Sequence, residues 1–468
     1  MIKTLGKQVI CFLVLMSAAA VFSIMLSGCA TLKQPPHEFK YQQEEAVKDL
    51  QEKRFPYPET QFIVLADPHY YHPSLGTSGP DFEAYIRDDR KMLTKSDEIL
   101  DAGIKRVRQE HADFILICGD LTKDGEKINH RYVAEKIGNL HPSADIFVIP
   151  GNHDIKSGAA RRYTEDGSEP VENVSPEEFR EIYAHYGYSS ALDEDPASLS
   201  YVAEPVPGLW LLALDSCLWR ENEPDKHPVT DGRFSEQTLE WIEETLIQAK
   251  QQKKAVIAFM HHGLMEHYPA NEKYYGEYVI DNSDTVTRLF AAYGVQLVFT
   301  GHFHAQDITV KHTKEPLGRV FDIETGSLLT WPCPYRIVEI SGRNTCTIES
   351  RFIDSIESMP EGFPEYARKF AFDGTVGLAR DALEKHRVSE KGMEILAPQI
   401  AEAYLAHLKG DEKKPQQVLT TKGTGLMGRV VVFFQKDLVQ GWWTDLPPED
   451  NRLAIDIKYS PDPGDNRN

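Results

Sequence analysis

The sequence FIVLADPH, residues 62–69, places an aspartate and a histidine directly after five apolar residues. An apolar run of this length, rich in β-branched residues, is typical of a strand buried on both faces. Asp67 and His69 therefore stand just beyond the carboxyl end of a predicted strand, 62–66. Four more runs of strand length lie further along the chain, at 114–118, 146–150, 256–260 and 297–300.

Segments with helical periodicity separate these runs, at 88–110, 126–140, 176–186, 236–250 and 283–293. Shorter apolar runs predict additional strands at 199–203, 209–214, 307–310, 320–323, 337–340 and 346–352. Buried strands that alternate with amphipathic helices predict an α/β architecture, in which helices cover both faces of a central sheet.

Polar residues follow every one of the five principal strands. After Asp67 and His69 come Gly119-Asp120, Gly151-Asn152-His153-Asp154, His261-His262 and Gly301-His302-Phe303-His304. Ligands of open α/β sheets bind in the crevice beyond the carboxyl ends of the strands, so these side chains are expected at one edge. Oxygen and imidazole donors without a thiolate suit first-row divalent or trivalent metal ions. The glycines permit sharp exits from the strands and close approach of the backbone.

Taken in order, these residues match the pattern DxH, GD, GNH[DE], H and GHxH, and the chain resembles the calcineurin-like metallophosphoesterase superfamily. The match spans about residues 62–352, and every motif is present. The resemblance implies an α/β fold with a metallophosphoesterase-type central β-sandwich flanked by helices. It also implies a dinuclear centre of divalent or trivalent metal ions, such as Mn, Fe or Zn.

The resemblance also implies a role for each motif residue. One metal ion would be held by Asp67, His69, Asp120 and His304, and the second by Asp120, Asn152, His261 and His302, with Asp120 bridging. His153 would face the phosphoryl group without binding metal, and Asp154 would orient it.

Two further positions are left open by the sequence. His262 is expected either at the rim of the site near the substrate or in solvent. Tyr70 is expected either at the substrate mouth or in a surface loop of mixed residues.

The implied reaction is hydrolysis of a phosphoester, in which a hydroxide bridging the metal ions attacks phosphorus. His153, if protonated, would stabilise charge on the phosphoryl oxygens or protonate the leaving group. The motifs do not separate a phosphodiesterase from a phosphomonoesterase or 5′-nucleotidase, because both substrates present the same non-bridging oxygens. A binding lipoprotein that has lost activity is less expected, because no ligand residue is missing.

The charge of the chain limits its partners. With 51 Lys and Arg against 72 Asp and Glu, the formal charge is −21. Nucleic-acid polymers attract basic surfaces, so none is expected as a partner. A small phosphorylated substrate is compatible with this charge if metal ions offset it locally.

The first residues have the layout of a signal peptide, with Lys3 and Lys7 ahead of an apolar run at 9–26. The run ends in Leu26-Ser27-Gly28-Cys29, which resembles the lipobox of bacterial lipoproteins. By that resemblance residues 1–28 are removed and Cys29 is lipidated, anchoring the protein to a membrane of the bacterial cell envelope. An uncleaved transmembrane anchor is the alternative. Both interpretations place the globular part outside the cytoplasm.

The remaining chain divides into three predicted parts: a tether at 29–60, a metallophosphoesterase domain at 61–354, and a mainly helical C-terminal domain with an acidic tail at 355–468. The last part has helical periodicity at 365–372, 377–385 and 393–409, and a predicted late strand at 430–434. It resembles the C-terminal cap of exported bacterial proteins grouped with class III cyclic-nucleotide phosphodiesterases. That resemblance favours a phosphodiester substrate, with 3′,5′-cyclic nucleotides as one candidate.

Cysteines are too few for a disulfide framework. Apart from Cys11 and Cys29 the chain carries Cys118, Cys217, Cys333 and Cys346. A bridge between Cys333 and Cys346 is compatible with the sequence, which leaves the connectivity open.

Overall fold

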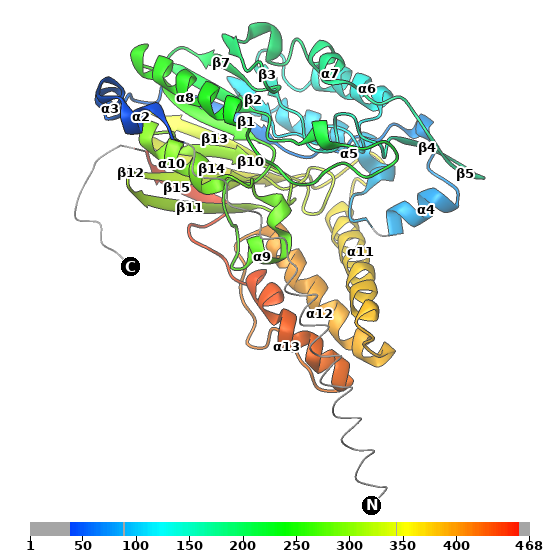
Figure 1. Ribbon diagram of the computed structural model, residues 1–468. Helices are drawn as coiled ribbons and strands as arrows, with labels where there is room; N and C mark the ends of the chain where they lie inside the picture. Colours follow the sequence, from blue (N-terminus) through cyan, green and yellow to red (C-terminus); the bar gives the residue numbers. More distant parts are fainter. Residues whose placement is uncertain (1–37, 88, 343, 458–468) are drawn as a thin grey trace, which may run out of the picture. The chain divides into compact units, whose positions relative to one another are not determined.

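The computed structural model describes residues 38–87, 89–342 and 344–457 (Figure 1). The predicted signal peptide and Cys29 lie outside these residues. No helix in the described part of the chain is both long and apolar enough to cross a membrane. The described residues from Phe39 to Ile457 form one compact unit.

Two mixed β-sheets form the centre of this unit. The six-stranded sheet has the order β15 (Arg452–Asp456), β14 (Thr345–Phe352), β13 (Pro334–Ser341), β1 (Thr60–Leu65), β2 (Phe114–Ile117) and β3 (Asp145–Val148). The seven-stranded sheet has the order β11 (Asp307–Lys314), β12 (Leu317–Glu324), β10 (Leu297–Thr300), β9 (Ala255–Met260), β8 (Leu209–Leu214), β7 (Tyr201–Val206) and β6 (Asp193–Glu194).

The sheets pack face to face through large buried side chains. The rings of Phe62 on β1 and Phe299 on β10 meet edge to face at 5.3 Å, and both are fully buried. The sandwich implied by the family resemblance is therefore confirmed. The single central sheet predicted from the strand pattern is wrong, because a strand buried on both faces looks the same in sequence whichever sheet it joins.

Parallel pairing aligns the strand ends that carry the motifs. β1 pairs in parallel with β2, and β2 with β3; in the other sheet β8, β9 and β10 pair in parallel. Parallel neighbours need crossover connections, which are mostly helical here. The helices of the sandwich region are α4 (Pro80–Arg87), α5 (Ser96–Val107), α6 (Lys127–Ile137), α7 (Pro176–Ile182), α8 (Glu236–Gln251), α9 (Asn271–Tyr275) and α10 (Ser283–Tyr293), and a small hairpin joins β4 (Arg161–Thr164) to β5 (Gly167–Pro170).

A helical cap follows β14, made of α11 (Phe363–Lys385), α12 (Glu390–Lys409) and α13 (Gly425–Gly441) (Figure 1). The predicted late strand at 430–434 is wrong, because these residues lie within α13. Their β-branched run favours a strand, but Val431 and Val432 pack into the cap core while Phe433 and Phe434 are exposed, which is a helical alternation. The chain then returns to the sandwich, where β15 pairs with β14.

The predicted tether packs against the sandwich from Phe39 onward. Its helices are α2 (Lys40–Gln43) and α3 (Glu45–Gln51). Phe39 and Tyr41 are buried, and Glu243 of α8 accepts hydrogen bonds from the backbone N–H groups of Lys40 and Tyr41 at 2.8 and 3.0 Å. The described part of the predicted tether is therefore packed against the sandwich and is not a free linker.

The four described cysteines are free and buried. Cys346 on β14 lies opposite Ile340, whereas Cys333 precedes the other end of β13 and its carbonyl accepts from the N–H of Ile353 at 3.0 Å. The antiparallel register thus separates Cys333 from Cys346, and the bridge considered from the sequence is not formed.

Candidate metal centre

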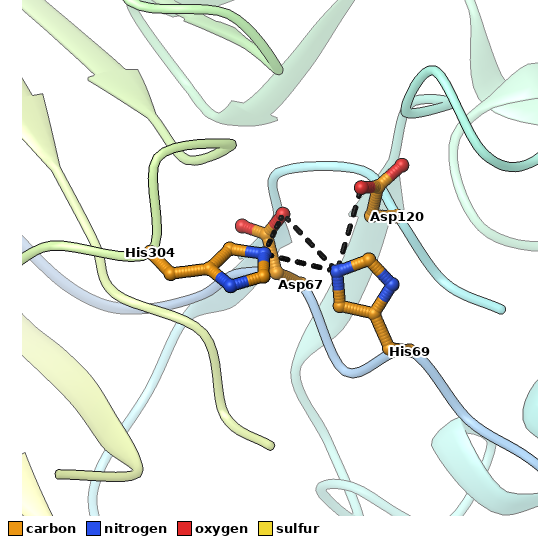
Figure 2. Close-up of side chains that lie close together, drawn as sticks. All are labelled: Asp67, His69, Asp120 and His304. Atoms are coloured by element: carbon orange, nitrogen blue, oxygen red, sulfur yellow. Dashed lines mark hydrogen bonds and ion pairs between the residues drawn. The ribbon is translucent and has the colours of Figure 1, made fainter. Parts of the chain in front are cut away.

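Four of the predicted ligands converge where β1, β2 and β10 end (Figure 2). One ligand atom from each of Asp67, His69, Asp120 and His304 lies within 4.8 Å of the others. The Nε2 atoms of His69 and His304 are 3.0 Å apart, and His69 Nε2 is 3.5 Å from Asp120 Oδ2. Asp67 and His69 come from the end of one strand, and Asp120 and His304 follow two other strands. The four side chains thus form a single cluster.

A second group shares Asp120 with the first. Ligand atoms of Asp120, His261 and His302 also lie within 4.8 Å of one another. His261 Nε2 is 3.5 Å from Asp120 Oδ2 and 3.1 Å from the side-chain oxygen of Asn152. All seven residues predicted as ligands therefore lie together.

The donor set suits cations. Asp67 Oδ1 is buried without a hydrogen-bond partner, although His304 Nε2 and His69 Nε2 lie 3.5 and 3.9 Å away. A buried carboxylate oxygen without a donor is costly, and a metal ion would satisfy it. The Nδ1–H of His261 donates to the carbonyl of Cys118 at 2.9 Å, which leaves its Nε2 lone pair facing Asp120. These residues therefore fit a metal centre.

Electrostatic interactions within the cluster agree with this fit. Burial alone would raise the pKa of Asp120, but His261, His153 and His69 hold it well below its ordinary value. Burial opposes charge on His261 as well, yet Asp120 raises the pKa of that imidazole to about 9. The centre thus attracts positive charge even though most of its ligand residues are buried.

The backbone of the ligand residues is in the left-handed region. Asp67, His69, Asp120, His302 and His304 have φ angles of 51°, 38°, 47°, 78° and 71°. Non-glycine residues adopt this region only at a cost of about 1–3 kcal/mol each, and such residues gather at functional sites. The motif turns therefore place the ligand side chains at the centre at a cost in backbone conformational energy.

Two motif glycines make room for these turns. A Cβ on Gly151 would collide with the backbone nitrogen and Oδ1 of Asp120, and one on Gly301 would collide with Oδ2 of Asp67. The close approach expected from the sequence thus occurs directly against the candidate ligands.

Comparison with known proteins agrees with this geometry. The family model of the calcineurin-like phosphoesterases matches residues 60–306. The chain belongs to this family. It is a metal-dependent phosphoesterase of the calcineurin-like type, with the mixed α/β fold described above.

Solved structures similar to this calcineurin-like phosphoesterase include three phosphatases or nucleotidases. A dimetal phosphatase from Danio rerio has 16% identity and a TM-score of 0.42, and the match covers 64% of this chain and 97% of that one. Purple acid phosphatase PPD1 from yellow lupin (Lupinus luteus) seeds has 13% identity and a TM-score of 0.39, with coverages of 64% and 53%. A 5′-nucleotidase from Candida albicans has 13% identity and a TM-score of 0.30, with coverages of 71% and 59%. No curated protein matches the sequence.

His153 lies at the open side of this phosphoesterase centre. Its side chain is 21% exposed, whereas that of Asp120 is 2% exposed, and its Nε2 is 4.0 Å from Asp120 Oδ2. Its Nδ1 lies 2.7 Å from Oδ1 of Asp124, an arrangement in which the ring donates to the carboxylate. Burial lowers the pKa of His153, but Asp120 and Asp124 outweigh it and raise the pKa above its ordinary value.

Asp124, not Asp154, therefore orients His153, which corrects the role predicted for Asp154. The Asp154 carboxylate accepts hydrogen bonds from the backbone N–H groups of Gly151, Leu121 and Thr122 at 2.8–3.0 Å. It thus ties the turn before Asn152 to the loop after Asp120, and burial together with Asp120 raises its pKa to about 7. Asp124 stands four residues after Asp120 in the sequence, and this spacing is the signal that could have identified it as the partner of His153.

The two positions proposed for the rim are interior. His262 is fully buried; its Nδ1 is 2.7 Å from Ser216 Oγ, and its Nε2–H donates to the carbonyl of Thr230 at 2.9 Å. Burial, with His261 beside it, lowers the pKa of His262 to about 3, so the ring is neutral. Tyr70 is 1% exposed, and its hydroxyl donates to Asp97 at 2.8 Å. His262 lies neither at the rim nor in solvent, and Tyr70 lies neither at a substrate mouth nor in a surface loop. Both expectations for each residue are wrong, because these side chains are buried and hydrogen-bonded within the protein.

Lys91 is an electrostatic neighbour of the centre that the sequence did not reveal. Burial and Lys91 together hold the pKa of His69 well below its ordinary value, and Lys91 also acts on His153 and Asp124. Its Nζ lies 3.5 Å from Oδ2 of Asp89. It follows no strand, so only the folded chain brings this ammonium group near the centre.

The cap reaches the centre through Phe303, which lies between His302 and His304 in sequence. The Phe303 ring packs 6.2 Å from that of Tyr404 and 5.2 Å from that of His407, both on α12. Tyr278 lies on the other side, 4.9 Å from Phe303 and 4.5 Å from His302. The motif loop is thus held between the sandwich and the cap.

Proposed function

We propose that the chain is a dinuclear metal-dependent phosphodiesterase, with 3′,5′-cyclic nucleotides as a candidate substrate class. The observation that carries the proposal is Asp120, whose carboxylate is common to both ligand groups. Asp67, His69 and His304 would complete one metal site, and Asn152, His261 and His302 the other. Bound cations of the Mn, Fe or Zn type would activate water and neutralise charge on the phosphoryl oxygens.

His153 is placed to handle a proton at Nε2. Because Nδ1 is hydrogen-bonded to Asp124, the ring is fixed in orientation and its imidazolium form is favoured. From its partly exposed position the Nε2–H can stabilise charge on a phosphoryl oxygen or protonate the leaving oxygen. No other described residue of the predicted motifs combines this exposure with an anionic partner at Nδ1.

The local charge favours a diester over a monoester. A monoester carries about 1.5–2 negative charges near neutral pH, whereas a diester carries about one. Two lysines, Lys91 and Lys123, are the lysine or arginine residues among the principal electrostatic partners of His69, His153 and Asp124 in the described chain. Each is already paired with a carboxylate, Lys91 with Asp89 and Lys123 with Asp124. Limited cationic charge beside the metal ions suits the diester, which carries the lower negative charge. The half-buried ring of Tyr278, beside His302, offers a surface on which a nucleobase can stack.

The experiment compares hydrolysis of bis(p-nitrophenyl) phosphate and p-nitrophenyl phosphate by the Mn²⁺-loaded chain. Asp120→Ala should abolish metal-dependent turnover of the diester, and His153→Ala, which keeps every metal ligand, should reduce it to a small residual rate. His185→Ala and Asp166→Ala are matched controls at exposed positions and should retain it. A preference for the monoester would contradict the phosphodiesterase proposal and favour a phosphomonoesterase or 5′-nucleotidase. Absence of turnover of both esters by the metal-loaded chain would contradict both proposals.

We further propose that the enzyme acts outside the cytoplasm, anchored to a membrane of the cell envelope through lipidated Cys29. The support is the signal-like apolar run before Leu26-Ser27-Gly28-Cys29. In a bacterial host, radiolabelled palmitate should enter the wild-type chain but not the Cys29→Ser variant. Equal labelling, or protection of the folded part from protease added to spheroplasts, would contradict the proposed location.

A further inference from the structure

A second cluster of metal-ligand side chains lies where β11 begins and α12 ends. One ligand atom each from Asp307, His407 and Glu412 lies within 4.8 Å of the others. His407 Nδ1 is 2.8 Å from Glu412 Oε1 and 3.9 Å from Asp307 Oδ2. The three side chains are 1–2% exposed. The cluster shares no residue with the candidate metal centre.

The turn after α12 brings Glu412 back to His407. Gly410 and Asp411 both have positive φ angles, of 74° and 55°, which reverse the chain directly after the helix. The N–H of Asp411 donates to Asp450 Oδ2 at 2.7 Å, and the N–H of Asp450 donates to Asp411 Oδ1 at 2.9 Å. This paired contact fixes the turn, so the position of the Glu412 carboxylate is set by the fold.

The described residues do not satisfy the cluster. Glu412 Oε2 is buried without a hydrogen-bond partner, and the Glu412 side chain is 1% exposed. Oδ1 of Asp445, an electrostatic neighbour of Glu412, is also buried without a partner. Native interiors rarely leave such oxygens without a donor, and a bound ion is one of the accepted explanations.

Negative charge around the cluster exceeds positive charge. Ligand oxygens of Asp411, Asp445 and Asp450 lie within 4.8 Å of one another, close to Asp307 and Glu412. The guanidinium of buried Arg336 donates to the backbone carbonyls of Asp450, Asp307 and Glu324, not to their carboxylates.

His267 neutralises only part of this charge, because its ring is shared among three carboxylates, those of Asp307, Asp322 and Glu324, at 2.8, 3.1 and 3.5 Å. It binds Asp307 through Oδ1 at 2.8 Å and leaves Oδ2 facing His407. Burial and Asp307 raise the pKa of Asp450 to about 10, and burial with neighbouring carboxylates raises that of Asp445 to about 7. The fold thus gathers more carboxylates here than its own cations neutralise.

We propose that Asp307, His407 and Glu412 bind a further divalent cation, separate from the catalytic centre, that fastens the cap to the sandwich. Two carboxylates and one imidazole suit a first-row ion such as Mn²⁺ or Zn²⁺. The donor spacing of 2.8–3.9 Å is close to that within the catalytic cluster, where 3.0–3.9 Å separates donors.

The position of the cation explains what it would do. The ring of His407 packs edge to face against Phe303 of the catalytic loop, and the N–H of Gln306 donates to the carbonyl of Leu408 at 3.2 Å. Asp307 follows Gln306 directly. The cation would therefore fix the end of α12 against the segment that follows His304, a structural role that needs no contact with substrate.

The test counts metal ions in the mature chain after loading with Mn²⁺ and desalting, by inductively coupled plasma mass spectrometry. Wild type should carry one more ion than Glu412→Gln or His407→Gln. Glu402→Gln, an exposed change on the same helix, is the control and should keep the wild-type count. Equal counts in wild type and in a Glu412→Gln chain with wild-type circular dichroism would overturn the proposal.

A second measurement is independent of catalysis and of the phosphodiesterase proposal. The Asp120→Asn variant, impaired at the catalytic centre, should still gain thermal stability when Mn²⁺ or Zn²⁺ is added. The same addition should give no gain in Asp120→Asn/Glu412→Gln. An equal gain in both variants would overturn the proposed site, whereas failure of diester hydrolysis alone would not affect it.

Discussion

Asp124→Asn tests whether His153 depends on the carboxylate that the structure places behind it. The change keeps the size of the side chain but removes the negative charge 2.7 Å from His153 Nδ1. A hydrogen bond to a charged group contributes about 1.5–3 kcal/mol. If the bond serves the imidazolium form in the transition state, kcat/KM for the diester should fall about 10- to 100-fold, because each 1.36 kcal/mol is a factor of ten.

The pH profile supplies a second readout with a defined sign. Asp120 and Asp124 raise the pKa of His153 against the effect of burial, so the protonated form persists to higher pH than in an ordinary histidine. Activity that needs this form is retained below that pKa and lost as the pH rises through it. Removing the Asp124 charge should therefore move the alkaline limb of kcat/KM to lower pH, by about one to two pH units for the energies above.

A double-mutant cycle separates this role from a structural one. Asp124 is also an ion-pair partner of buried Lys123, which keeps Glu126 at 3.5 Å as its other partner. Thermal unfolding shows how much stability the variant loses, and rates are compared on chains that remain folded. In a His153→Ala background Asp124→Asn should cost little further activity. An equal loss with and without His153 would refute the reasoning and assign Asp124 to packing around Lys123.

Other perturbations test the centre and the fold. Gly151→Ala should lower Mn²⁺ affinity, measured by isothermal titration calorimetry, because the added Cβ collides with Asp120; unchanged affinity would contradict the close approach. Burial lowers the pKa of His130 to about 4 in the folded chain, below its ordinary value of 6.5. Protonation of His130 therefore favours the unfolded chain. The free energy of unfolding should fall by up to about 3 kcal/mol as the pH drops from 6.5 toward 4. Urea unfolding of wild type and His130→Gln should show that loss in wild type only. Leu396→Ala in the cap core should cost about 2–5 kcal/mol in the same assay, whereas exposed Phe433→Ser should change stability by no more than about 0.5 kcal/mol, and similar losses would contradict the burial pattern of α13.

The sequence predicted the strands and the ligand set because both depend on local patterns. An apolar run followed at once by Asp or His places that side chain at a strand end, whichever sheet the strand joins. Parallel pairing then brings distant strand ends to one edge. For this reason the residues from Asp67 to His304 could be named without knowing that they come from two sheets.

The errors concern side-chain direction and burial, which depend on three-dimensional packing. Asp154 is adjacent to His153, but its carboxylate points to backbone N–H groups, so the partner of His153 is Asp124 from another loop. His262 follows a ligand histidine, yet the alternation of side chains turns it into the interior against Ser216. Lys91 belongs to no motif, so no local pattern could mark it.

The late return of the chain to β15 has a consequence for how the protein is made. β14 finds its outer partner only after all three cap helices have been synthesised, because Thr345 pairs with Asp456. A nascent chain therefore presents β14 as an unprotected edge for the time needed to add about 100 residues, and an open edge favours association with other chains. Truncation just after β14, at the apparent boundary of the cap, would make that exposure permanent. A minimal catalytic domain would have to rejoin β14 to β15 by a short linker instead of simply ending early.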